Sequence, residues 1–246
     1  MGEIPRRPDP GADAVAEARW RQARALGRMS AASGIVFAAL FVVAMLLLRQ
    51  APRLGDPDEA YARFYAGGGE ALATLGIHVV PFVGLALLWH LSATRAMLRA
   101  VPRRYSPVQT WLQMASGLLF LCMMFVGSAA VAAVALLSVF DVTPLPAPDV
   151  ARALAAVGYG LMFIFGVRVA GMYMITTTGM AGAAGLLPRW LAVVGYLAAA
   201  FLLVTTTYHP VVLLVFPAWV VVVSIALLLR AGAAHSAISS ANTDGN

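Results

Sequence analysis

The sequence predicts an all-α, polytopic membrane protein: a bundle of six transmembrane helices with both termini in the cytoplasm. Of its 246 residues, 61% are hydrophobic and 11% are charged, whereas soluble domains are about 45–50% apolar and about 25% charged. The mean hydropathy is +0.83. The charged residues cluster at the chain ends and between apolar runs, which is the distribution that hydrocarbon requires.

The net charge of +6 comes from 17 arginines and no lysine. These arginines flank apolar runs and form no basic stripe, so membrane topology explains them and no nucleic-acid partner is expected. Arginine without lysine, together with abundant Ala, Gly and Val, indicates a high-GC bacterium. We therefore expect a multi-pass protein of the bacterial plasma membrane. The single cysteine, Cys122, excludes an intrachain disulfide.

Residues 1–29 form a polar, arginine-rich segment. From Asp13 onward the pattern is helical, and Arg21, Arg24 and Arg28 share one face opposite apolar residues. This pattern predicts an amphipathic cytoplasmic helix on the membrane surface, with its arginines close to anionic headgroups.

Six apolar runs follow, each of at least about 18 residues, the length that crosses the hydrocarbon. They are Ala31–Leu48, Ala71–Leu91, Thr110–Val139, Ala153–Met180, Leu187–Thr206 and Val211–Leu229. Together they define a transmembrane domain over residues 30–230. Residues 231–246 are small and polar, so we expect a disordered cytoplasmic tail.

The arginines also predict the orientation. With the amino terminus inside, the cytoplasm receives those of residues 1–29 and Arg95, Arg99, Arg103, Arg104, Arg189 and Arg230, while the outside receives Arg49, Arg53, Arg63 and Arg152. This excess places both termini in the cytoplasm. The same orientation puts three tryptophans at the inner interface, where amphipathic rings settle: Trp89, Trp111 and Trp190.

The first outer connection contains a short helix of its own. Asp56 can cap it, Pro57 fits the first helical position, Glu59 completes a capping box, and Gly67–Gly69 ends it. We expect an interfacial helix that plugs the outer surface of the bundle. The alternative is a lid over a cavity that contains Arg168.

Arg168 lies near the middle of the fourth predicted span, where a charge is costly and usually functional. No acidic residue lies well within any span. The favoured interpretation is a structural tie, in which Arg168 bonds His78 and carbonyls freed by a kink at Pro81. A second is a cavity that binds a lipid headgroup, carboxylate or other anion. A third shifts the span to Val169–Leu187 and places Arg168 at the outer interface. The candidate ligand-binding residues are Arg168, His78, Gln113, Ser128 and Trp219.

Other chemistry finds little support. His78 and His90 are twelve residues apart and therefore lie about 120° apart around a helix, so they cannot face one metal or haem together. The chain has no HExxH, no Cys/His cluster, no GxSxG and no glycine-rich phosphate loop. We expect no cofactor, no metal and no catalytic residue. A membrane enzyme or haem protein is the third choice of function.

Several motifs resemble a known group. They are Leu187-Pro188-Arg189-Trp190, Gly195-Tyr196, Phe216-Pro217-Ala218-Trp219, Asp58-Glu59-Ala60 and Arg63-Phe64-Tyr65. The chain resembles a group of actinobacterial integral membrane proteins that is similar to the larger DUF4386-type assemblage of six-span proteins. The resemblance implies the six-span fold and an actinobacterial source, and it carries no activity or ligand.

The predicted function is therefore non-enzymatic: a bundle that binds a membrane lipid or small anion, or an accessory subunit of a membrane complex. A homo-oligomer or a larger assembly is compatible with either. The alternative is a small transporter or channel with a polar cavity around Arg168.

Overall fold

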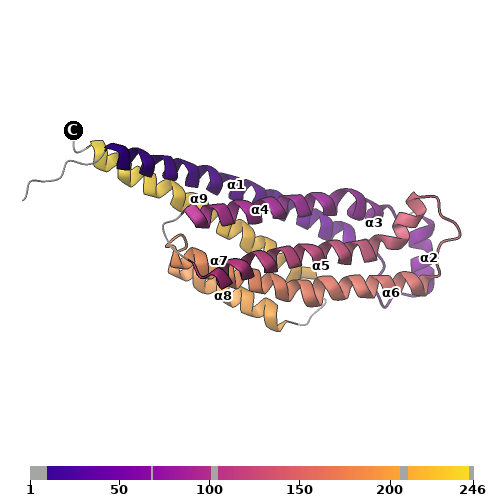
Figure 1. Ribbon diagram of the computed structural model, residues 1–246. Helices are drawn as coiled ribbons and strands as arrows, with labels where there is room; N and C mark the ends of the chain where they lie inside the picture. Colours follow the sequence, from indigo (N-terminus) through magenta and orange to yellow (C-terminus); the bar gives the residue numbers. More distant parts are fainter. Residues whose placement is uncertain (1–9, 68, 101–104, 206–209, 244–246) are drawn as a thin grey trace, which may run out of the picture.

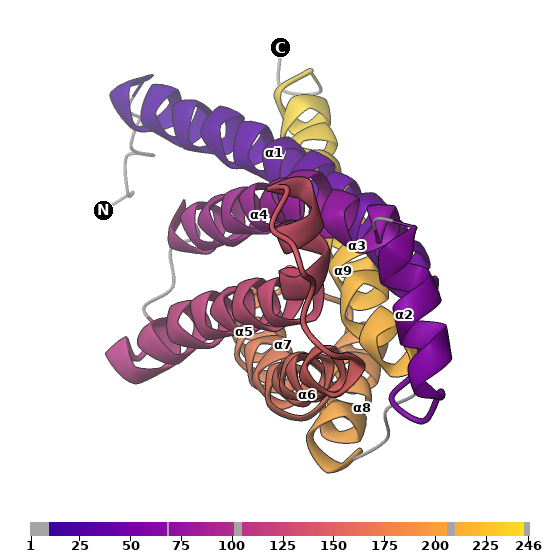
Figure 2. The same cartoon turned by 90° about the vertical axis from the view of Figure 1, so that its right-hand side faces the viewer.

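A computed structural model describes residues 10–67, 69–100, 105–205 and 210–243, and helices dominate this part of the chain. They pack lengthwise into an elongated bundle (Figure 1, Figure 2). The helices are α1 (Pro10–Leu48), α2 (Asp58–Ala66), α3 (Glu70–Thr74), α4 (Val80–Ala100), α5 (Pro107–Val139), α6 (Pro148–Tyr159), α7 (Val167–Ala183), α8 (Arg189–Val204) and α9 (Pro210–Thr243). Two π-helical turns, η1 (Leu75–Val79) and η2 (Gly160–Gly166), join α3 to α4 and α6 to α7.

Five segments of the described chain are long and apolar enough to cross a membrane. They are Ala25–Leu48, Glu70–Arg99, Pro107–Val139, Pro148–Ala183 and Val211–Leu229. The remaining predicted span corresponds to α8, which is apolar but has 16 residues. The chain is a multi-pass helical membrane protein, and the sixth crossing stays a prediction.

The outward faces of these helices are apolar. Large side chains with more than half of their surface exposed include Trp89 (61%), Trp111 (69%), Leu197 (66%) and Val204 (81%). So much exposed apolar surface on several helices is unfavourable in water and fits contact with lipid.

The amino-terminal segment differs from the prediction. Instead of a separate surface helix followed by a span, α1 is one helix from Pro10 to Leu48. No proline interrupts it, and Gly27 alone is too weak a breaker to end it. Residues 1–9 lie outside the described chain. The start of α1 and the end of α9 extend beyond the other helices at the same end of the molecule (Figure 1).

Helix also continues where a disordered tail from residue 231 was expected. Helix α9 runs through Pro217 and continues to Thr243. The residues after Arg230 include several alanines, the strongest helix former, and neither proline nor a glycine pair stops the helix. Residues 244–246 lie outside the described chain.

The short helix expected in the first connection is confirmed as α2, but its amino-terminal cap differs from the prediction, and its place on the outer side stays a prediction. Pro57 occupies the cap position, and no side chain makes a capping bond. The Asp56 carboxylate instead accepts a hydrogen bond from the backbone N–H of Arg53 at 2.8 Å. The helix ends at Ala66 with Gly67 as its cap, and Gly69 at φ +58° begins α3.

Both π-helical turns lie near residues that were singled out from the sequence. Turn η1 ends two residues before Pro81, which has no N–H to bond the Ile77 carbonyl. Turn η2 ends two residues before Arg168. Such wide turns insert one extra residue into a helix, leave local carbonyls without their usual partners and often mark functional positions. The sequence pattern contained no sign of them.

Helices α5 and α6 approach each other through two glycines. A Cβ on Gly158 would overlap the carbonyl oxygen of Gly127 and would lie 2.5 Å from a methyl of Val131. A Cβ on Gly127 would lie 3.0 Å from the Gly158 carbonyl oxygen. Small residues at helix crossings allow this close approach in membranes.

Candidate functional site

The five residues proposed from the sequence do not form one site. Arg168 is half-buried, and one of its guanidinium nitrogens donates a hydrogen bond of 2.6 Å to the carbonyl of Ile164, one turn earlier in the same polypeptide segment. Ile164 belongs to turn η2, so Arg168 bonds a carbonyl of the wide turn that ends two residues before it. The favoured interpretation expected bonds to His78 and to carbonyls near Pro81; the partner is a backbone carbonyl, but it belongs to the arginine's own segment and ties no helices together.

Arg168 lies within the apolar segment Pro148–Ala183, which is long enough to cross a membrane. Gly171, three residues further along, packs against Leu203 near the end of α8, with 3.2 Å from a Cβ position on Gly171 to Leu203 Cγ. Arg168 therefore lies close to the level at which α8 ends. The third interpretation, which begins the span at Val169, stays a prediction.

Within the described chain, no hydrogen bond joins His78 or Ser128 to Arg168, and the two residues have different surroundings. His78 is exposed on the outside of η1. The Ser128 hydroxyl is satisfied by its own helix, because it donates to the carbonyls of Met124 at 2.7 Å and Phe125 at 3.1 Å. Ser128 also lines a small apolar cavity among α1, α4 and α5. Neither residue contributes to a polar binding site.

Gln113 belongs to a buried polar seam that crosses five helices, α1, α4, α5, α7 and α9. Its amide nitrogen donates to the Thr177 hydroxyl at 3.2 Å. Tyr173, one turn before Thr177 on α7, places its hydroxyl beside those of Thr177 and Thr94 without a hydrogen bond of regular geometry to either. Thr94 bonds the Ser30 hydroxyl of α1 at 2.8 Å. We define the polar seam as Ser30, His90, Thr94, Gln113, Tyr173, Thr177, Thr178, Trp219 and Ser224.

His90 occupies the α1 side of this seam. It is 2% exposed. Its Nδ1 lies 3.0 Å from the Ser30 carbonyl oxygen and its Nε2 lies 3.5 Å from the Thr94 hydroxyl. Gly34 makes room for it, since a Cβ there would lie 3.1 Å from His90 Nδ1 and 2.5 Å from the Ser224 hydroxyl.

Trp219 belongs to the α8–α9 side of the seam. Its indole nitrogen and the Thr178 hydroxyl converge on Gly195, where a Cβ would lie 3.1 Å and 2.8 Å from them. The Trp219 ring stacks on Phe216 at 6.3 Å and meets Tyr173 edge to face at 6.0 Å. Phe216 in turn contacts rings from two other helices, Phe37 at 5.8 Å and Phe120 at 4.7 Å. These five rings form an aromatic cluster next to the polar seam.

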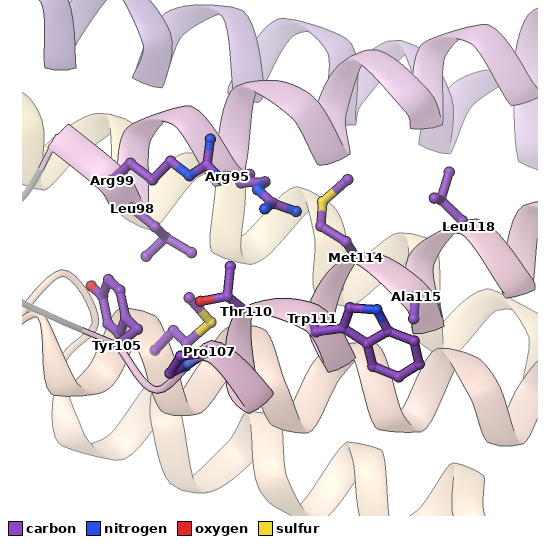
Figure 3. A pocket seen from close by; sticks show the side chains of 11 residues that line it. Arg95, Leu98, Arg99, Tyr105, Pro107, Thr110, Trp111, Met114, Ala115 and Leu118 are labelled. Carbon is purple, nitrogen blue, oxygen red and sulfur yellow. The ribbon is translucent and has the colours of Figure 1, made fainter.

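An open groove of about 680 Å³ separates the end of α4 from the start of α5. Figure 3 shows Arg95, Leu98 and Arg99 on the α4 wall, opposite side chains that include Thr110 and Trp111. The complete lining is Arg95, Leu98, Arg99, Tyr105, Pro107, Thr110, Trp111, Met114, Ala115, Leu118 and Met180. We call this pocket the α4–α5 groove.

The charged side chains that line the α4–α5 groove are both positive. Within the described chain, neither Arg95 nor Arg99 makes an ion pair or a side-chain hydrogen bond. The acidic side chains that the structure describes lie at the opposite, α2 end of the bundle: Asp56, Asp58, Glu59, Glu70, Asp141 and Asp149. Two guanidinium groups without acidic partners, flanked by an exposed tryptophan, give the edge of the apolar bundle a positively charged surface, and guanidinium is a preferred partner of carboxylate and phosphate.

From the sequence alone, Arg95 and Arg99 were assigned a role in orienting the chain and not in a site. The sequence does contain a pattern that indicates the groove. The two arginines are four residues apart, so they share one face of α4. Thr110 and Trp111 follow shortly after the connection to α5 and therefore lie at the same end of the bundle.

The α2 end carries a different interaction. Arg152 of α6 forms an ion pair with Asp58 at 2.7 Å, donates to the Asp56 carbonyl at 3.0 Å and lies 4.9 Å from the centre of the Tyr61 ring. Tyr61 is 1% exposed and donates to the Arg53 carbonyl at 3.1 Å. Arg152 thus fastens α2 to α6, and α2 covers this end of the bundle.

Metal chemistry has no obvious centre here. Among the described residues, no group of three or more His, Cys, Asp or Glu side chains could hold a metal ion. Comparison with protein-family models, curated proteins and solved structures finds no match to the chain. The α4–α5 groove and the polar seam are therefore the candidate sites of this protein.

Proposed function

We propose that this protein is a six-span, non-enzymatic protein of the bacterial plasma membrane that binds the headgroup of an anionic phospholipid in the α4–α5 groove. The observation that carries the proposal is the pair Arg95 and Arg99, which project into an open pocket without an acidic partner. A volume of about 680 Å³ falls within the range of about 300–1,000 Å³ that small-molecule sites occupy.

The surroundings favour a lipid over a free anion. Trp111 and Leu118 line the α4–α5 groove and are 69% and 41% exposed on the outside of the bundle. A phosphate between the two arginines would therefore have apolar surface beside it for acyl chains. Tryptophan at such a position is typical of the headgroup level of a bilayer.

The predicted topology supports the same choice. The arginine excess orients the groove towards the cytoplasm, and the cytoplasmic leaflet carries the anionic lipids that attract basic residues near the membrane. The orientation of the groove follows from the six-span arrangement, in which α8 makes the fifth crossing. The proposal also includes an actinobacterial source and membership of the DUF4386-like group of six-span proteins, which the resemblance of the sequence motifs implies.

Native mass spectrometry of the purified protein with added phosphatidylglycerol tests the proposal. Each basic residue near the lipid surface contributes about 1 kcal/mol. The double variant Arg95→Gln/Arg99→Gln should therefore lose about 2 kcal/mol, or roughly 30-fold in affinity. Arg189→Gln is the matched control, because Arg189 is exposed at the same predicted interface but does not line the groove.

Two further arms separate the possible ligands. Phosphatidylcholine should bind more weakly than phosphatidylglycerol, and inorganic phosphate should compete poorly because it lacks acyl chains. Equal retention of phosphatidylglycerol by the wild type and the double variant would contradict the proposal. The alternative of a transporter built around Arg168 is not favoured, because Arg168 bonds its own backbone.

A further inference from the structure

The polar seam contains five buried polar atoms that no protein group satisfies within the described chain. They are Gln113 Oε1, Tyr173 Oη, Thr178 Oγ1, Trp219 Nε1 and Ser224 Oγ. Each belongs to a side chain that is at most 6% exposed. Because native proteins leave few buried polar groups unpaired, five such atoms in one seam call for a ligand.

The chemistry of these atoms defines the ligand. The amide oxygen of Gln113 only accepts, the indole nitrogen of Trp219 only donates, and the three hydroxyls do either. None of the five carries a charge, and a neutral ligand that both donates and accepts hydrogen bonds matches them. Thr178 Oγ1 and Trp219 Nε1 face the same glycine, because a Cβ on Gly195 would lie 2.8 Å and 3.1 Å from them. Two polar atoms this close together can share one water molecule through hydrogen bonds of about 2.7–3.2 Å.

The seam approaches the α4–α5 groove along two helices. Gln113 lies one turn beyond Thr110, and Thr177 lies one turn before Met180; Thr110 and Met180 both line the α4–α5 groove. From there the polar groups lead through Tyr173 and Thr94 to His90. On the other side, the aromatic cluster with ring separations of 4.7–6.3 Å closes the path.

We propose that the polar seam is a binding site for a file of internal water molecules, entered from the α4–α5 groove and closed by the aromatic cluster. The waters bond the five atoms and join the polar groups of α1, α4, α5, α7 and α9 into one network that reaches His90. This inference stands apart from lipid binding, since the seam holds water whether or not the groove holds a headgroup.

Exchange of the Trp219 indole proton with deuterium tests the proposal directly. The protein is labelled uniformly with ¹⁵N, and Trp219→Phe assigns the indole signal. The indole proton should exchange within minutes while the backbone amides of the surrounding α9 turns stay protected, because water is present without unfolding. Gln113→Leu, which removes the polar entrance, should slow the exchange roughly tenfold, the factor that 1.4 kcal/mol represents. An indole proton as protected as the neighbouring amides would overturn the proposal.

A pair of threonine variants gives an independent test. The Thr176 hydroxyl is satisfied by the carbonyls of Met172 and Tyr173, both at 3.0 Å, whereas the Thr178 hydroxyl has no protein partner. If water bonds Thr178, Thr178→Val should lower the melting temperature relative to Thr176→Val. If the seam is dry, Thr178→Val removes an unpaired buried group and raises the melting temperature, which would contradict the inference.

Discussion

Gly158 offers the sharpest test of the packing between α5 and α6. Alanine there would press a methyl group into the Gly127 carbonyl oxygen and to within 2.5 Å of a Val131 methyl. Overpacking of this kind costs about 1–3 kcal/mol, because backbone cannot move aside as a flexible side chain can. A helical Gly→Ala change also gains about 1 kcal/mol in helix propensity, which must be measured separately.

Gly160 provides that measurement, since a Cβ there meets nothing within 4 Å. Gly160→Ala should keep or raise stability, and Gly158→Ala should be less stable than Gly160→Ala by about 1–3 kcal/mol. Urea unfolding in mild detergent, followed by tryptophan fluorescence, gives both values. Equal stabilities, or a more stable Gly158→Ala, would refute the close contact of α5 with α6.

Three further predictions follow from single residues. Arg168→Gln should fold with almost unchanged thermal stability, because the side chain bonds only the Ile164 carbonyl of its own segment; failure to accumulate would restore the idea of an interhelical tie. Arg152→Gln should increase proteolysis near α2, with little change in overall stability because the ion pair to Asp58 is exposed to solvent; unchanged proteolysis would contradict its fastening role. Burial, followed by the nearby Tyr61, raises the pKa of Tyr65 to about 12. Since the unfolded tyrosine loses its proton first, stability should fall as the pH rises from 10 to 12, and Tyr65→Phe should reduce that fall; identical pH curves would refute it.

Much of the architecture could be predicted from the sequence, because the length of an apolar run and the turn residues at its ends determine local structure. Five of the predicted spans reappear as helices that are long and apolar enough to cross a membrane, and α2 lies where Pro57 and the following glycines placed it. The errors concern helix ends. Alanine-rich segments continued as helix in α1 and α9 where polarity had suggested a surface element and a disordered tail.

The candidate site was less predictable because it depends on how the helices are rotated against one another. The sequence groups Gln113 and Trp219 with Arg168 as candidate ligand-binding residues, yet in the structure they belong to the polar seam with Tyr173 and Thr177. Composition cannot reveal which hydroxyls face each other across four helices. The bond of Arg168 to Ile164 depends in turn on the wide turn η2, which comes from a shifted hydrogen-bond register and leaves no pattern in the residues.

Photo-crosslinking with a headgroup-modified, diazirine-bearing phosphatidylglycerol tests the central claim most directly. The proposal predicts that labelled peptides concentrate on residues 95–99 and 105–118, the two walls of the α4–α5 groove, in protein reconstituted into bilayers. The labelling should fall strongly in Arg95→Gln/Arg99→Gln and persist in Arg189→Gln. Labelling spread evenly over the exposed faces of α8 and α9, or unchanged in the double variant, would contradict a headgroup site between α4 and α5.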